Sequence, residues 1–262
     1  MVIRVTSVAG LVTVQDLGRP GFMHLGVPRG GALVREAHVR ANAAVGNSAA
    51  AATFEIFGRL VVSAIDPIRL ATDRGDVHEL AAGEALVVES GGSRVRYLAV
   101  GGGVDVRERL GSRSTLLVAE LGGLEGRALR RGDVLAACPS PLHEIESPDE
   151  APLPSPPGQP NVFAVCPGTE LGRLDGTFTI RPSSDRVGVR LQGRPVAARA
   201  ISASVPMVQG AIQVPPDGQP IVLGPDHPTT GGYPVVAFLD DADFSRFFAL
   251  SPGAQISFRT VD

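Results

Sequence analysis

The chain has 262 residues, a formal net charge of −3, 44% hydrophobic residues and 19% charged residues. This length suits one large domain or two small ones, and this composition excludes a disordered chain. A net charge so close to zero creates no field that would hold nucleic acid or an anionic membrane. The 32 glycines and 22 prolines favour many short strands and turns over a helical bundle.

The first half of the chain is predicted to be mainly β. Short runs rich in Val, Ile, Leu and Phe, bounded by Gly, Pro or Asp, indicate strands. One segment, Ala32–Val45, instead has apolar residues at helical spacing and ends at Gly46, so it is predicted to be a helix. The predicted strands are Val2–Val8, Phe54–Phe57, Leu60–Ile65, Ala85–Glu89 and Arg94–Val100.

Prolines mark the predicted domain boundary. Eight of them lie between Pro139 and Pro160, and proline breaks both helices and sheet ladders. We therefore interpret residues 139–160 as a linker between an N-terminal β-rich subdomain, residues 1–138, and a C-terminal subdomain, residues 161–262.

The second half is also predicted to consist mainly of short β-strands. A short helix is predicted at Asp241–Leu250, with Asp241 as its N-cap and Phe244, Phe247 and Phe248 on one face. The fold class is therefore mainly β, with two β-barrel-like subdomains and a few short helices. The predicted strands of this half are Val162–Val165, Thr177–Arg181, Val187–Leu191, Ala211–Val214, Ile221–Leu223, Val235–Leu239 and Gln255–Val261.

The chain contains no lysine, so all 24 basic residues are arginine. Arginine stays charged and is not an amine nucleophile. The chain therefore cannot form a Schiff base with a carbonyl compound, cannot carry biotin on a lysine side chain and has no P-loop lysine for ATP.

Cysteine and histidine usage predicts neither disulfides nor a metal site. Cys138 and Cys166 lie far apart, no CxxC motif occurs, and the five histidines lack zinc-site spacing. No signal peptide and no stretch of about 18 apolar residues is seen in the sequence. We expect a reduced, cytoplasmic protein.

Polar residues interleaved with glycines mark a first candidate site at Val14–Pro28, which reads VQDLGRPGFMHLGVP. Glycines let backbone approach a ligand, and the side chains of Gln15, Asp16 and Arg19 can then face it. The alternative is a turn-rich connection with a surface Asp–Arg pair.

Two glycine-containing turns offer weaker signals. Gly101–Gly103 follows a predicted strand, but no long helix follows, which argues against a dinucleotide site. Gly111–Thr115 lacks the lysine of a phosphate loop. It is interpreted either as a polar turn or as an anion or carboxylate clamp built from Arg113 and backbone donors.

The second half contains a candidate amide site. In Ser183–Arg190, Asp185 is accompanied by two arginines, which most often indicates a structural ion pair. The loop Gly224–Pro234 reads GPDHPTTGGYP and lies between two predicted strands. It contains several side chains that can donate or accept hydrogen bonds. Such a cluster can bind a small planar amide.

Seven segments together resemble the urea amidolyase-related carboxyltransferase family. This family includes allophanate hydrolase subunit 2, the C-type subunit of 5-oxoprolinase and the antagonist of the sporulation-kinase inhibitor. The match runs in order over nearly the whole chain apart from the proline segment. The segments are Thr13–Leu33, Arg40–Asn47, Gly111–Thr115, Gly126–Asp133, Ser183–Leu191, Gly210–Leu223 and Asp226–Pro234.

The resemblance implies a fold and partners. The fold would be the A and B portions of a carboxyltransferase domain, with a cyclophilin-like β-barrel in the C-terminal half. A companion protein related to the sporulation-kinase inhibitor would share the active cleft, and a third component of lactam-utilisation type would join them. The assembly would open 5-oxoproline to glutamate at the expense of ATP.

Two other functions stay open. The chain could be a carboxyltransferase component that moves a carboxyl group from carboxybiotin to urea or a related amide. In that case biotin would have to arrive on a separate carrier, and in the 5-oxoprolinase case ATP would be bound elsewhere in the assembly. The other function is a non-catalytic regulatory partner of a protein that resembles a kinase inhibitor.

The resemblance and the residue chemistry together predict a set of substrate-binding residues but no individual catalytic roles. The chain would form one wall of a pocket for a flat, amide-like molecule, with Gln15, Arg113, Gln213 and Tyr233 lining one recess. The predicted set is Gln15, Asp16, Arg19, Asn47, Arg113, Ser114, Asp185, Arg190, Gln213, Asp226, Thr230 and Tyr233.

Three positions depart from the family pattern. Family members usually read Pro-x-Ser-Gly-Ala-x-Asp near the first helix, where this chain has Gly30 for the serine and Val34 for the acid. The usual arginine before a glycine pair is replaced by Gly101. If any of these lost side chains is functional, this copy is catalytically altered.

Overall fold

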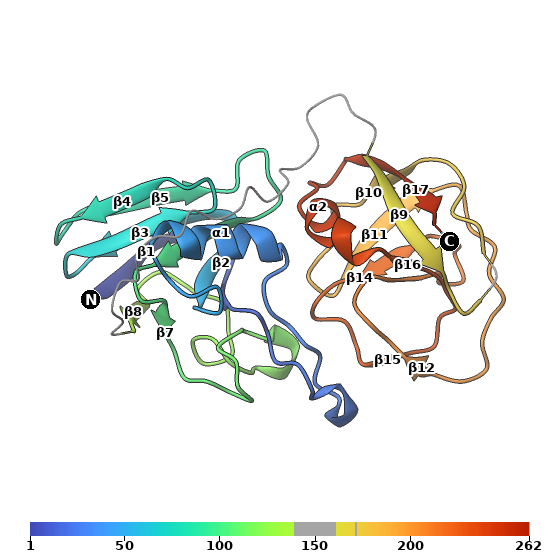
Figure 1. The fold of residues 1–262 in the computed structure, drawn as a ribbon, viewed down its shortest axis with the longest axis horizontal. Coiled ribbons are helices and arrows are strands. Elements are labelled where there is room, and N and C mark those ends of the chain that lie inside the picture. Colours follow the sequence, from blue (N-terminus) through green and yellow to red (C-terminus); the bar gives the residue numbers. More distant parts are fainter. Residues whose placement is uncertain (139–160, 171, 262) are drawn as a thin grey trace. The chain divides into compact units, whose positions relative to one another are not determined.

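The computed structural model describes residues 1–138, 161–170 and 172–261. Strands outnumber helices in this part of the chain, which confirms the mainly β fold class (Figure 1). The chain divides into two compact units, Met1–Arg19 with Gly30–Ala151 and Pro20–Arg29 with Pro152–Asp262. The segment 20–29, which was expected to belong to the first half, thus groups with the second unit. The predicted linker, residues 139–160, lies outside the described residues.

The first unit is built on one antiparallel sheet of eight strands. They pair in the order β4-β3-β6-β2-β1-β8-β7, and β5 also pairs with β2. This path has two ends, because β4 and β7 do not pair with each other, so the unit is an open sheet rather than the barrel-like unit expected. The strands are β1 (Val2–Gln15), β2 (Thr53–Ala64), β3 (Ile68–Thr72), β4 (Val77–Leu80), β5 (Ala85–Glu89), β6 (Arg96–Val100), β7 (Val104–Asp105) and β8 (Val134–Ala137).

The two central strands are longer than the sequence predicted. β1 continues past Val8 to Gln15, and the two runs predicted as separate strands form the single strand β2. Gly10 and Gly58 lie opposite each other in this pair, with φ of +99° and +111°. Glycine adopts such angles without steric cost, so both strands can bend there without ending.

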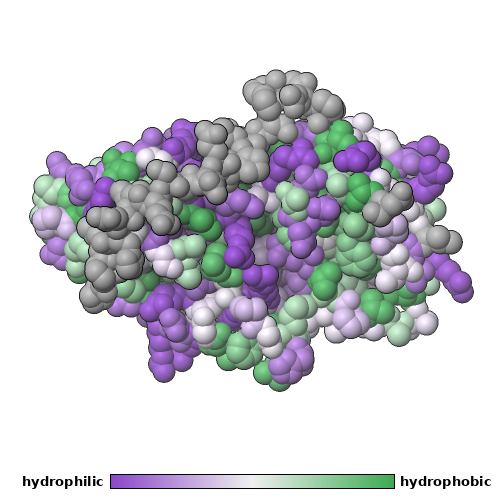
Figure 2. Space-filling view, viewed as in Figure 1, coloured by the Kyte–Doolittle hydropathy of each residue, from purple (hydrophilic) through white to green (hydrophobic). Residues whose placement is uncertain are grey.

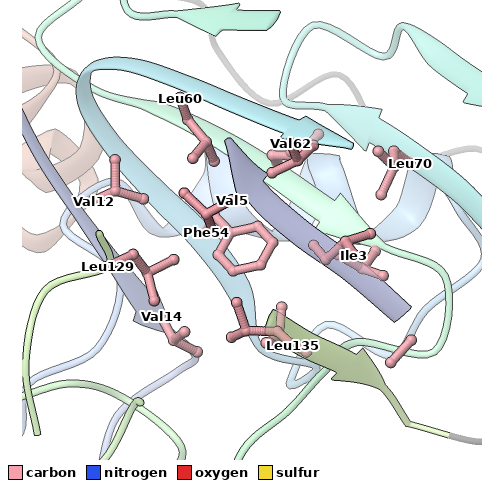
Figure 3. Packing of buried hydrophobic residues seen from close by; sticks show 14 of the residues in the cluster. Ile3, Val5, Val12, Val14, Phe54, Leu60, Val62, Leu70, Leu129 and Leu135 are labelled. Carbon is pink, nitrogen blue, oxygen red and sulfur yellow. The ribbon is translucent and has the colours of Figure 1, made fainter. Parts of the chain in front are cut away.

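The hydrophobic core of the first unit lies around β1 and β2 (Figure 3). Val5, Val12 and Phe54 are fully buried, and Leu129 and Leu135 pack against the same cluster. Each such side chain contributes about 1.5–3 kcal/mol when it leaves water. This core fixes the ends of β1 and β2, where the polar residues considered below are found.

The helix predicted at Ala32–Val45 is α1, which spans Arg35–Ala44. It begins at Arg35 because Val34 has the non-helical backbone angles φ −117° and ψ 89°, and the N–H groups of Leu33 and Val34 donate to side chains of the sheet. The hairpin formed by β3 and β4 was not predicted, since β4 reads VHEL and is a half-exposed edge strand. A short 3-10 helix, η2, spans Leu117–Ala119.

The second unit contains a closed barrel of seven strands in the order β10-β11-β14-β13-β16-β9-β17. All neighbouring strands are antiparallel except β9 and β17, which are parallel. Each barrel strand was predicted from the sequence to within three residues. The barrel strands are β9 (Asn161–Pro167), β10 (Phe178–Ile180), β11 (Gly188–Gly193), β13 (Ala211–Gln213), β14 (Ile221–Leu223), β16 (Val235–Leu239) and β17 (Gln255–Thr260).

Short elements complete this unit. The two-residue strands β12 (Val205–Pro206) and β15 (Thr230–Gly231) pair with each other, and the 3-10 helix η1 spans Met23–Leu25. The predicted helix Asp241–Leu250 is divided into the 3-10 helix η3 (Asp241–Asp243) and α2 (Phe244–Phe248). Its capping side chain is Asp240 rather than Asp241, because the Asp240 carboxylate accepts from the N–H of Ala242.

The interior of the barrel is aromatic at the end covered by α2. Phe247 and Phe248 are fully buried, and Phe247 packs edge to face on Phe163 with ring centroids 5.2 Å apart. Such pairs contribute about 0.5–1.5 kcal/mol beyond area burial. The predicted apolar helix face therefore serves to close the barrel core.

The surface of both units mixes polar and apolar residues over short distances on the face seen in Figure 2. No helix among the described residues is both long enough and apolar enough to span a membrane.

Candidate functional site

Asp16 is the centre of the first candidate site. It follows the end of β1, and its carboxylate accepts hydrogen bonds from the N–H groups of Gly18 (2.8 Å) and Arg113 (2.6 Å) and from the hydroxyls of Ser112 (2.7 Å) and Ser114. The Asp16 N–H in turn donates to the Ser114 hydroxyl (3.0 Å). The backbone donor of Arg113, but not its guanidinium, is thus directed at Asp16, which ties residues 112–114 to the end of β1.

Gln15 and Arg19, on either side of Asp16, are fully buried. The Gln15 amide donates to the Thr13 hydroxyl (3.0 Å) and to the carbonyl of Thr115 (3.1 Å), while its Oε1 is buried without a partner. The Arg19 guanidinium donates to the carbonyl of Ser114. Both side chains therefore anchor the segment 112–115, and neither is open to a ligand in this chain.

Asn47 and Arg113 are also engaged. The Asn47 amide donates to Asn42 Oδ1 (2.9 Å) and the Val100 carbonyl (2.8 Å), and its oxygen accepts from the N–H of Gly102 (2.8 Å). Arg113 pairs with the exposed Glu108. The Asn47 side chain therefore links α1 to the turn after β6 by hydrogen bonds.

A buried acidic residue, Glu55, lies beneath the start of α1. Its carboxylate accepts from the Tyr97 hydroxyl (2.5 Å) and from the N–H of Leu33 (2.8 Å), and the Tyr97 hydroxyl accepts from the N–H of Val34 (2.9 Å). Glu55 and Tyr97 are fully buried. They satisfy two backbone donors at the N-terminal end of α1, where N–H groups have no acceptor within the helix.

His38, on α1, completes this buried polar group. Its ring nitrogens lie 2.9 Å from the Thr53 hydroxyl and 3.0 Å from the carbonyl of Ala49. Burial lowers the pKa of His38 from 6.5 to about 4, although the Ala49 carbonyl and the charge of Asp16 act in the opposite direction. The imidazole is therefore neutral at pH 7.

This neutral histidine predicts a loss of stability in mild acid. Between pH 6.5 and 4 the unfolded chain binds a proton at His38 that the folded chain does not, so stability falls as the pH falls. We expect the wild type to lose about 2 kcal/mol more than His38→Gln between pH 7 and pH 5. Urea denaturation at the two pH values measures this difference. The carboxylates are common to both proteins, so their contribution to the pH dependence of stability cancels in the comparison. Equal losses in the two proteins would contradict a buried neutral His38.

The structure bears differently on the three departures from the family pattern. Val34 is the N-cap residue of α1 and gives no side-chain cap, so an acidic residue there would cap the helix. At Gly101 a Cβ would lie 3.4 Å from the carbonyl oxygen of Arg69, which is an ordinary van der Waals contact, so the structure does not explain the loss of the arginine there. Gly30 has φ of +62°, a conformation that favours glycine.

In the second unit, Asp226 belongs to a buried ion pair. Its carboxylate accepts from the Nε (2.7 Å) and an Nη (2.9 Å) of Arg186, and the two residues are 7% and 4% exposed. The pair joins the turn before β11 to the loop after β14. The neighbouring His227 is also buried, and burial lowers its pKa while the Pro228 carbonyl and Asp226 act in the opposite direction.

The remaining candidates of the second unit differ in exposure. Asp185 is exposed and accepts from the N–H groups of Val187 (2.9 Å) and Gly188 (3.0 Å), so it stabilises a turn. Arg190, Thr230 and Tyr233 are exposed, and Gln213 is 9% exposed on β13.

The predicted residues thus form two groups, one in each unit. The structure brings Gln15, Asp16, Arg19, Arg113 and Ser114 together at the end of β1. Gln213 and Tyr233 belong to the other unit, so the single recess predicted for them with Gln15 and Arg113 stays a prediction.

Sequence reasoning missed Glu55, Tyr97, His38 and Arg186 as buried polar residues. An available signal was the charge of Glu55 inside an otherwise apolar strand run, TFEIF, because a charged residue in a central strand is rarely buried without partners.

Among residues 1–138, 161–170 and 172–261, no group of three His, Cys, Asp or Glu side chains could hold a metal ion. A cavity of about 300 Å³ lies in the second unit, and it contains none of the predicted site residues. Its lining includes Cys166, Thr169, Glu170, Val236, Phe258 and Thr260.

Comparison with known proteins identifies clear relatives. A family model described as carboxyltransferase domain, subdomain A and B, matches residues 25–260. The chain is 35% identical to the C-type subunit of 5-oxoprolinase from Escherichia coli strain K12, over 94% of this chain and 87% of that protein. It is 29% identical to the corresponding 5-oxoprolinase subunit from Haemophilus influenzae, over 99% of this chain and 91% of that protein.

Larger proteins contain a similar region. The chain is 30% identical to urea amidolyase of Lachancea kluyveri over 97% of this chain, but over only 16% of that protein. The crystal structure of K. lactis urea amidolyase superposes with a TM-score of 0.89 and 25% identity, covering all of this chain and 19% of that one. The chain therefore spans less than a fifth of these multi-domain relatives.

Proposed function

Because the chain belongs to the family of carboxyltransferase domains with subdomains A and B, we propose that it is the C-type subunit of an ATP-dependent 5-oxoprolinase. The observation that carries this proposal is that the chain is 35% identical in sequence to the E. coli 5-oxoprolinase subunit over most of the length of both chains. The assembly would hydrolyse the ring amide of 5-oxoproline and release glutamate.

The proposal includes partners. A companion protein related to the sporulation-kinase inhibitor, of the B type in 5-oxoprolinase, would form the active cleft together with this chain, and a lactam-utilisation subunit would complete the assembly. ATP binding is placed in another component, since this chain has no lysine for a P-loop. A cytoplasmic location follows from this role.

The hydrogen-bond pattern supports different roles for the two units, structural in the first and substrate-binding in the second. The polar groups of Asp16 and Asn47 are used within the first unit, where they fix loops. Arg190 and Tyr233 of the second unit are exposed. We therefore place substrate contacts on the barrel, where binding and charge stabilisation would be supplied by guanidinium and amide groups.

A second candidate function is carboxyl transfer from carboxybiotin to urea or a related amide. The match to L. kluyveri urea amidolyase over 97% of this chain favours it. Here biotin would be covalently held by a separate carrier protein, because this chain has no lysine to which it could be attached.

Reconstitution distinguishes these functions. The chain is purified with its two proposed companions and assayed for glutamate formation from 5-oxoproline and ATP. We expect glutamate only when all components, ATP and 5-oxoproline are present. A complex that forms but is inactive on 5-oxoproline, and that carboxylates urea when a biotin carboxylase and carrier are added, would establish the second function. A complex inactive in both assays would support the regulatory role.

A further inference from the structure

Three residues on neighbouring barrel strands lie in one row. Arg190 of β11 pairs with Ile221 of β14, and Ile221 pairs with Gln213 of β13. Residues that are paired across strands project from the same face of a sheet. Their sequence neighbours Val189, Val222 and Ile212 are fully buried, so Arg190, Ile221 and Gln213 project from the outer wall of the barrel.

Gln213 is largely buried but has unused hydrogen-bonding groups. It is only 9% exposed, and its side chain makes no hydrogen bond within the described residues. Its amide atoms are not sealed from solvent, because neither is among the fully buried atoms without a partner. One acceptor and two donors are therefore available to a ligand.

The strand next to Gln213 is irregular, because β16 has one extra residue, Val236, opposite the step from Ile212 to Gln213. The register between β13 and β16 shifts between Ile212 and Gln213, so that Gln213 pairs with Val235. Such bulges are frequent beside binding sites, and this one leaves the alternation of β13 itself regular. The apolar cluster of Met207, Ala211, Leu223 and Val235 supports the same face of the barrel.

Arg190 supplies a charge at the other end of the row. Its side chain is exposed and forms no ion pair within the described residues, in contrast to the buried Arg186, which is paired with Asp226. With neighbouring strands about 4.8 Å apart, the backbones of Arg190 and Gln213 are about 10 Å apart. The long arginine side chain can lean over Ile221 toward Gln213 across that distance.

We propose that Gln213, Ile221 and Arg190 form a binding strip for a lactam that carries a carboxylate, as 5-oxoproline does. This proposal rests on the proposed function and names the residues that recognise its substrate. The N–H and C=O of a lactam lie on the same side of the amide, so one carboxamide can accept from the first and donate to the second. Ile221 contacts the apolar ring carbons, and the guanidinium of Arg190 binds the carboxylate with two hydrogen bonds.

The strip also distinguishes substrate from product and from urea. Ring opening removes the amide that pairs with Gln213, so glutamate is held only by its carboxylate and leaves. Urea has no carboxylate for Arg190 and no apolar ring for Ile221. The same three residues therefore favour hydrolysis of a lactam over carboxylation of urea.

Substitutions in the complete assembly test the strip. Gln213→Leu and Arg190→Leu are each expected to raise KM for 5-oxoproline at least about tenfold, as is typical when a charged or buried hydrogen-bond partner is lost. Arg259→Leu is the matched control, since it removes an exposed arginine from β17 of the same barrel, and it should leave KM unchanged. Thermal denaturation verifies that each variant is folded.

Inhibition by 2-pyrrolidinone, a lactam without a carboxylate, separates the two roles. Gln213→Leu should weaken this inhibition, whereas Arg190→Leu should leave it as in the wild type. An active assembly whose KM and inhibition are unchanged in both variants would overturn the strip while leaving the proposed function intact. If the wild-type assembly does not hydrolyse 5-oxoproline, calorimetric binding of 5-oxoproline to the assembly decides. The strip is supported if the wild-type assembly binds 5-oxoproline and both variant assemblies do not. It is overturned if the wild type does not bind 5-oxoproline, or if the wild type and the two variants bind it equally.

Discussion

Gly10→Ala is expected to destabilise the first unit by about 4 kcal/mol or more, a large part of the roughly 5–15 kcal/mol that typically stabilises a domain. A Cβ at this position would lie 2.1 Å from the carbonyl oxygen of Phe57, and a Cβ at Gly58 would lie 2.2 Å from that of Ala9. Both obstacles are backbone atoms, so no side-chain rotation relieves the clash. The positive φ of Gly10 adds a cost of about 1 kcal/mol for any residue with a Cβ.

The reason for this close approach is the change of partners along β2. Residues Phe54–Ile56 pair with β6, whereas Arg59–Ser63 pair with β5, and Gly58 lies between the two sets. The strand must bend there while keeping its pairing with β1. The two opposed glycines allow the backbones to approach at the bend, so a side chain on either one should separate the central strands.

Urea denaturation of Gly10→Ala and Gly83→Ala measures this effect. Gly83 also has a positive φ, +89°, but a Cβ there would meet no atom within 4 Å. We expect Gly83→Ala to lose only about 1 kcal/mol, the cost of the backbone conformation alone. If the two variants lose the same stability, the close approach at Gly10 does not exist.

The same glycine pair shows what sequence reasoning could predict of the fold. The apolar runs on both sides of Gly58 were identified correctly as β, and the glycine was interpreted as a break. Only tertiary pairing with β1 shows that it is a bend within one strand. The strands of the barrel were predicted well because each is short, apolar and bounded by turn residues. β4 was missed because its alternation is weak and half of its residues are exposed.

For the candidate site, the sequence indicated residue types but not their partners. Asp16 and Arg113 were both proposed to face a ligand, yet the Arg113 N–H donates to Asp16 across 97 positions of sequence. Long-range contacts of this kind decide whether a polar group is available. Periodicity identifies which face of a strand is apolar, but it does not show whether a polar group on the other face already has a partner.

The largest effect expected in the second unit is at its buried ion pair. Asp226→Ala should cost about 3–5 kcal/mol, because it leaves the Arg186 guanidinium at 4% exposure without its bidentate partner. The pair joins the turn before β11 to the loop that contains Thr230 and Tyr233. Its loss should therefore also loosen the segment next to the binding strip.

A second variant tests whether the cost comes from an uncompensated charge. In the double variant Arg186→Met with Asp226→Leu both charges are gone, and most of the lost stability should return, since apolar replacements of a buried pair are often neutral. Asp175→Ala is the matched control. Its pair with Arg173 has a similar distance, 3.2 Å, but the side chains of Asp175 and Arg173 are 60% and 86% exposed, so the expected loss is below about 1 kcal/mol.

Chemical denaturation of the wild type and the three variants, followed by a probe of the barrel, shows how strongly Arg186 and Asp226 depend on each other. A double variant as unstable as Asp226→Ala would show that the pair holds its two loops by specific hydrogen bonds that apolar contacts do not replace. In that case KM for 5-oxoproline should be higher than in the wild type for both Asp226→Ala and the double variant. If instead the double variant regains both the stability and the KM of the wild type, the ion pair has no role beyond neutralising its own two buried charges. The position of Arg190 is then set by the barrel register alone.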